Sequence, residues 1–98
     1  MIKILVEAYC PTIEDVDELS NRFWENYSYF ADFEEVEYEY NKETGMVRFV
    51  WAGKADELSE EDVDHLLRLT HHAEALYEDS NIEYTHVEVC IDGVWYGR

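Results

Sequence analysis

Acidic side chains dominate the residues of this chain that could do chemistry. Glu35, Glu37 and Glu39 alternate with apolar or aromatic residues. In a regular strand this alternation places the three carboxylates on one side, about 6.6 to 6.8 Å apart. That spacing resembles successive phosphates on a nucleic-acid strand. The simpler interpretation is a strand with one solvated face, since any such strand shows the same alternation.

Like charges also recur four residues apart in the two segments that are predicted to be helical. The pairs are Glu14 with Glu18, Glu60 with Asp64, and Glu74 with Glu78. Each pair destabilises a helix by roughly 0.2 to 0.5 kcal/mol. The compensated pairs are Glu18 with Arg22, Glu61 with His65, and Asp64 with Arg68. Stability alone does not explain this choice, which indicates either a basic partner or a high-salt cytoplasm.

The whole chain repeats this bias. Its 98 residues include 24 Asp and Glu but only 7 Lys and Arg, which gives a net charge of −17. Such a field repels nucleic acid and anionic membranes, and it attracts basic protein surfaces. We therefore expect contact with a basic nucleic-acid-binding protein or complex, without direct nucleic-acid or membrane binding. The predicted partner-binding residues are Glu34, Glu35, Glu37, Glu39, Glu14, Glu18, Glu60 and Asp64.

Catalytic and metal-binding motifs give no comparable signal. Four histidines are present, at positions 65, 71, 72 and 86. His65 and His72 share a helix face but lie two turns apart, too far to share a metal ion directly. An acid and base cluster of Glu7, Tyr9, His86 and Glu88 on an open sheet is a minor alternative. We predict no enzyme activity, no metal and no cofactor.

The order of patterns predicts one α+β domain over residues 1–98. Alternation predicts strands over 2–10, 34–40, 46–52, 82–91 and 94–96. Thr12 with Asp15, and Ser59 with Asp62, form capping boxes that begin helices over about 12–30 and 59–77. Turns are predicted at residues 41–45, from Asn41 to Gly45, and at the dipeptide Asp92-Gly93.

This order, βαββαββ, predicts a ferredoxin-like split βαβ fold with an extra C-terminal strand. Two helices then cover one face of an antiparallel sheet, and the other face stays exposed. The first and fourth strands lie side by side, which places Cys10 and Cys90 at opposite ends. This arrangement argues against a disulfide between them, and we expect two half-buried thiols.

In composition, the small size, extreme acidity and aromatic content resemble the phage-encoded DNA-mimic inhibitors, which include antirestriction and anti-CRISPR proteins. This resemblance implies an inhibitor that occupies the nucleic-acid site of its target, and it covers no motif. The alternative is a regulatory or oligomerisation module that uses its open sheet through Tyr84, Trp95 and Tyr96. No membrane-length apolar segment or signal pattern follows Met1, so we expect a monomer or homodimer in the cytoplasm, that of the host if phage-encoded.

Overall fold

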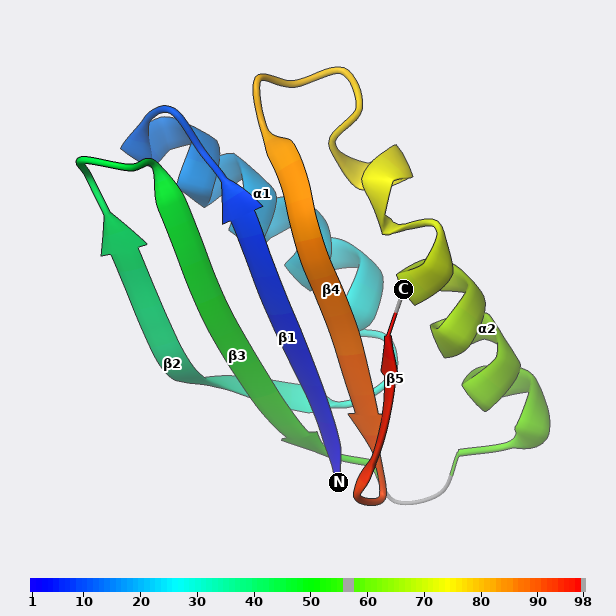
Figure 1. The fold of residues 1–98 in the computed structure, drawn as a ribbon. Helices are drawn as coiled ribbons and strands as arrows, with labels where there is room; N and C mark the ends of the chain where they lie inside the picture. The colour runs from blue at the N-terminus through cyan, green and yellow to red at the C-terminus, as the bar shows by residue number, and fades with distance from the viewer. Residues whose placement is uncertain (56–57, 98) are drawn as a thin grey trace.

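The computed structural model describes residues 1–55 and 58–97 and has an α+β architecture (Figure 1). The elements in chain order are β1 (Ile2–Tyr9), α1 (Ile13–Tyr27), β2 (Asp32–Asn41), β3 (Met46–Lys54), α2 (Glu60–His71), the 3-10 helix η1 (Ala73–Leu76), β4 (Glu83–Ile91) and β5 (Val94–Gly97). The strands form one antiparallel sheet in the order β2-β3-β1-β4-β5. The predicted α+β class, with two helices and an antiparallel sheet, is confirmed.

Strand β1 lies at the centre of the sheet and sorts its side chains between two faces. Ile2, Ile4, Val6 and Ala8 are almost fully buried beneath the helices. The intervening side chains point to the opposite face, as the pleat requires. Because β1 pairs with both β3 and β4, all three strands contribute alternate residues to the same core.

Both long helices begin where their capping boxes predict. The Thr12 and Ser59 side chains accept hydrogen bonds from the backbone N–H groups of Asp15 and Asp62. The predicted C-terminal ends were too late, since α1 ends at Tyr27 and α2 at His71. After α2 the chain tightens into η1, so the pattern that continued to residue 77 includes a change of helix type.

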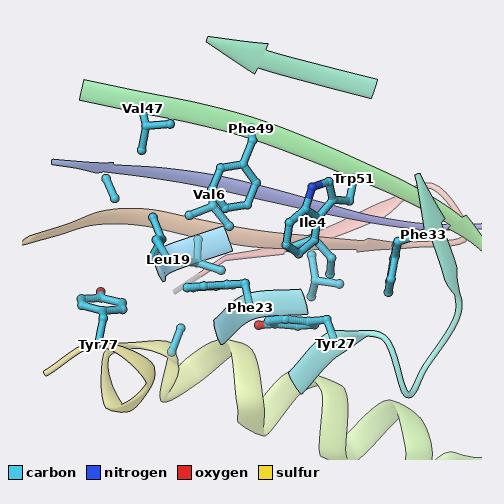
Figure 2. Packing of buried hydrophobic residues seen from close by; sticks show 14 of the residues in the cluster. Ile4, Val6, Leu19, Phe23, Tyr27, Phe33, Val47, Phe49, Trp51 and Tyr77 are labelled. Carbon is cyan, nitrogen blue, oxygen red and sulfur yellow. The ribbon is translucent and has the colours of Figure 1, made fainter. Parts of the chain in front are cut away.

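The core is built around aromatic residues of α1 and β3 (Figure 2). Phe23 is fully buried, and its ring centroid lies 5.7 Å from that of Tyr27, 6.3 Å from Phe49 and 6.5 Å from Tyr77. The Tyr27 hydroxyl also lies 2.9 Å from the Thr70 hydroxyl of α2. The Phe23 side chain of α1 thus contacts both the sheet, through Phe49, and the segment that follows η1, through Tyr77.

The β2–β3 hairpin contains a turn that requires glycine. Gly45 has φ +77° and lies against the Tyr9 ring. Its carbonyl accepts a 2.7 Å hydrogen bond from the Cys10 N–H, and its own N–H donates to the Asn41 carbonyl over 2.8 Å. A left-handed conformation in so little space favours a residue without a Cβ atom. The hydrogen bond from the Cys10 N–H connects the turn with the end of β1.

Strand β2 differs from the regular strand that the sequence predicts. A β-bulge separates Glu35 from Glu37, so that Glu35 lies opposite Trp51 while Glu37 lies opposite Val50. Directly opposed residues of an antiparallel pair point to the same side. Glu35 therefore faces the helix layer, and the predicted row of Glu35, Glu37 and Glu39 is wrong.

Candidate functional site

The bulge turns Glu35 of β2 toward the face of the sheet that the helices cover. We call this area the α1–β2 surface and define it by Glu14, Asp17, Trp24, Glu35 and Tyr38. Tyr38 lies opposite Phe49 on the same side of the sheet as Glu35. The positions of Asp17 and Trp24 in α1, seven residues apart, place them on one side of the helix.

Aromatic side chains line this surface between the two elements. The Trp24 ring packs edge-on against Trp51 at a centroid distance of 5.3 Å, and Trp51 packs against Phe49 at 4.9 Å. Trp51 is buried, whereas Trp24 and Tyr38 remain 42% and 47% exposed. The surface thus presents two partly exposed rings beside a buried aromatic pair.

Carboxylates surround these rings. Desolvation of the phenol, followed by the negative charges of Asp17 and Glu35, raises the pKa of Tyr38 above its usual value. Asp17 and Glu35 are exposed, and no ion pair among the described residues includes either of them. Their charges are therefore available to a partner.

Few cations offset the charge of the two elements. Helix α1 contains five acidic residues and one basic residue, Arg22, which pairs with Glu18. Strand β2 contains five acidic residues and no lysine or arginine. The predicted compensation of Glu18 is confirmed, and acidic residues outnumber basic ones by five to one in this helix.

On the open face of the sheet, acidic and basic side chains are more evenly mixed. Glu34, Glu37 and Glu39 point to this face, but Arg48 pairs with Glu37 at 2.9 Å. The predicted acid and base cluster also lies on this face, and it consists of Glu7, Tyr9, His86 and Glu88. Glu7 lies opposite His86, and Tyr9 lies opposite Glu83. His86 pairs with Glu88 at 3.1 Å. Acid and base therefore alternate across the strands, which is the usual pattern of a solvated sheet face.

The two predicted residues of α2 lie apart from the β2 acids. Glu60 and Asp64 are exposed on a helix that runs along β4 and β5, at the opposite edge of the sheet from β2 (Figure 1). Asp64 pairs with Arg68 at 3.0 Å, as the spacing predicts. Seven of the eight predicted residues are consequently divided among the α1–β2 surface, the open face and α2, and the eighth, Glu18, lies on α1 in its ion pair with Arg22.

The histidines are also dispersed. His65 packs against Phe30, and His71 packs against His72 at a centroid distance of 4.9 Å. Over residues 1–55 and 58–97, no three histidine, cysteine or acidic side chains are arranged to hold a metal ion. A hollow of about 330 Å³ lies between the C-terminal part of α2 and Tyr96, and His71 and His72 contribute to its lining.

The cysteines are unpaired and more buried than predicted. Cys10 follows the end of β1 and is fully buried, and Cys90 is 7% exposed opposite Lys3 near the start of β1. Their placement at opposite ends of neighbouring strands agrees with the expected absence of a disulfide. Burial, and next the nearby Asp15 carboxylate, raise the pKa of the Cys10 thiol from 9.0 to about 11.

Alkaline pH should destabilise the fold through Cys10. Between pH 9 and 11 the thiol ionises in the unfolded chain but stays protonated in the folded one, so the free energy of unfolding should fall with pH, by roughly 2 to 3 kcal/mol at most. Urea titrations from about pH 8 to about pH 11 measure this slope. Cys10→Ala should flatten it, and equal slopes for both proteins would contradict the assignment.

Together, these elements and surfaces define a small acidic α+β protein, whose described residues form one five-stranded antiparallel sheet, two α-helices and one 3-10 helix. No helix in the described part of the chain has the length and hydropathy needed to cross a bilayer. No family model, curated protein or solved structure matches the chain.

The partner-binding residues predicted from the sequence did not include Asp17, Trp24 or Tyr38. For Asp17 and Trp24, the seven-residue separation within a helix was a usable signal, because it places both on one face. The shift of Glu35 to that face depends on the bulge, and the alternating pattern of β2 contains no indication of it.

Proposed function

We propose that this chain is an acidic inhibitor that occupies the nucleic-acid-binding surface of a basic protein, as antirestriction and anti-CRISPR proteins of the DNA-mimic type do. The observation that carries the proposal is the α1–β2 surface, where exposed carboxylates from two elements lie beside exposed aromatic rings. Carboxylates on a rigid sheet and helix can meet the lysines and arginines that otherwise contact phosphates.

The uneven distribution of charge supports this proposal. Solvation alone requires only that charges lie outside, and the open face meets that requirement with acids and bases interspersed. The α1–β2 surface instead keeps like charges together at a cost to helix stability. A basic partner would turn that repulsion into attraction, with association that is fast and sensitive to salt.

We further propose the ferredoxin-like assignment as the finer description of the fold. Its support is the position of β1 between β3 and β4, with β2 beyond β3 and both helices packed into one core. Strand β5 would then be an addition at the β4 edge.

Competition with nucleic acid tests the proposed function. The immobilised chain should capture a nucleic-acid-binding protein from a lysate at low salt, release it at high salt, and release it to added duplex DNA or to RNA. The purified target should lose nucleic-acid binding when the chain is added. Capture that neither salt nor nucleic acid reverses would contradict the proposal.

A native circular dichroism spectrum in dilute buffer would remove adaptation to a high-salt cytoplasm as the reason for the acidity.

A second candidate function is self-association through β5. Val94, Trp95 and Tyr96 are all at least 40% exposed on this short edge strand. Trp95 faces the open side opposite Cys90, whereas Tyr96 lies opposite Val89 and faces α2, so the two aromatics do not share the open face as predicted. The side chain of Tyr84 lies outside the described part. Light scattering of the purified chain distinguishes a stable dimer from a monomer.

A further inference from the structure

We infer that the α1–β2 surface binds arginine side chains of the partner in preference to lysine. This inference rests on the proposed function and names the chemistry of its partner. The groups that carry it are the exposed rings of Trp24 and Tyr38 and the carboxylates of Asp17 and Glu35.

The rings supply a contact that discriminates between the two cations. A guanidinium group is planar and weakly hydrated, so it stacks on aromatic faces, whereas an ammonium group is compact and strongly hydrated. Trp24 is held against the buried Trp51, and Tyr38 occupies the β2 position opposite Phe49. The Trp24 ring is therefore positioned before binding, which lowers the entropy cost of stacking.

The carboxylates complete the site. A guanidinium group donates two parallel hydrogen bonds to one carboxylate, a geometry that an ammonium group cannot match. Asp17 lies on the same side of α1 as Trp24, and Glu35 lies on the same side of β2 as Tyr38. The negative charges of both carboxylates also raise the pKa of Tyr38. A guanidinium stacked on these rings would thus be within the field of both carboxylates.

The other exposed aromatic edge lacks this combination. Trp95 lies on β5 opposite Cys90, and its neighbour along the strand, Tyr96, lies beside Arg68, His71 and His72. The positive charge of Arg68 disfavours a guanidinium ligand beside Tyr96. Trp95 is consequently a matched control, since it is 47% exposed and lies outside the acidic surface.

Oligo-arginine and oligo-lysine peptides of equal length test the inference. Titration of the intact chain at low salt, followed by tryptophan fluorescence and calorimetry, should give an affinity for oligo-arginine at least about fivefold higher. Trp24→Leu should remove most of this preference, Trp24→Phe should retain part of it, and Trp95→Leu should leave it unchanged. Tyr38→Leu provides a second test at an exposed strand position, and far-UV circular dichroism checks that each variant is folded.

The outcomes separate this inference from the proposed function. Equal affinity for the two peptides would overturn the arginine preference, while salt-sensitive binding of both would still agree with an acidic binding protein. Binding of neither peptide would count against both proposals. A preference that survives in folded Trp24→Leu and Tyr38→Leu variants would overturn the assignment to the α1–β2 surface.

Discussion

Phe23→Ala should lower the free energy of unfolding by about 3 to 5 kcal/mol, the largest stability effect that we expect from a single substitution in this chain. Phe23 is fully buried and contacts aromatic rings from its own helix, from β3 and from the segment after η1. Its removal leaves a cavity that these elements, held by the rest of the core, can fill only in part. Urea denaturation followed by circular dichroism measures the loss.

A matched substitution on the same helix distinguishes the core contribution from helix propensity. Ile13 is 46% exposed at the start of α1, so Ile13→Ala should cost less than about 1 kcal/mol. Since domains of this size are stable by only about 5 to 15 kcal/mol, Phe23→Ala should also lower the melting temperature by many degrees. A loss below about 1 kcal/mol would show that the core does not depend on this ring.

Neutralising the α1–β2 surface should have the largest effect on binding. The triple substitution Glu14→Gln, Asp17→Asn and Glu35→Gln should weaken association with the basic target by about 2 to 5 kcal/mol if these carboxylates are desolvated at the interface. The reason is that each change leaves a buried cation of the target without its partner. Calorimetry or surface plasmon resonance at fixed salt measures the difference.

The control must remove the same charge from another place. Glu60→Gln, Glu61→Gln and Glu78→Gln remove three carboxylates from α2 and the segment that follows it, and Glu60 matches Glu14 as an acidic residue in the first turn of a helix. This variant should weaken binding by less than about 1 kcal/mol. Equal losses in the two variants would indicate that only the net charge matters, and would contradict the assigned surface.

Most of the fold could be predicted because local signals specify it. Capping boxes at Thr12 and Ser59 located both helix starts, and the alternation of β1 identified its buried face. The helix ends could not be placed with the same accuracy. Apolar residues such as Phe30 and Tyr77 continue the helical spacing, although they reach the core from a turn rather than from a helix.

The sequence predicted the acidic chemistry of the candidate site but not which residues lie together in it. The excess of carboxylate was visible in the composition, but the distribution of those groups depends on pairing between strands. A single extra residue at Val36 reverses the direction of Glu35 relative to a regular strand. No local pattern encodes which partner residues oppose a bulge, so the grouping of Glu35 with Asp17 required the three-dimensional structure.

The bulge in β2 also affects how readily the edge of the sheet could pair with another molecule. A long, flat strand at the margin of a sheet is a template on which further molecules can add indefinitely. In β2 the irregular register interrupts the ladder, and the carboxylates on both sides repel an identical neighbour. We therefore expect the feature that turns Glu35 toward the helix to disfavour polymerisation along that margin in a concentrated solution.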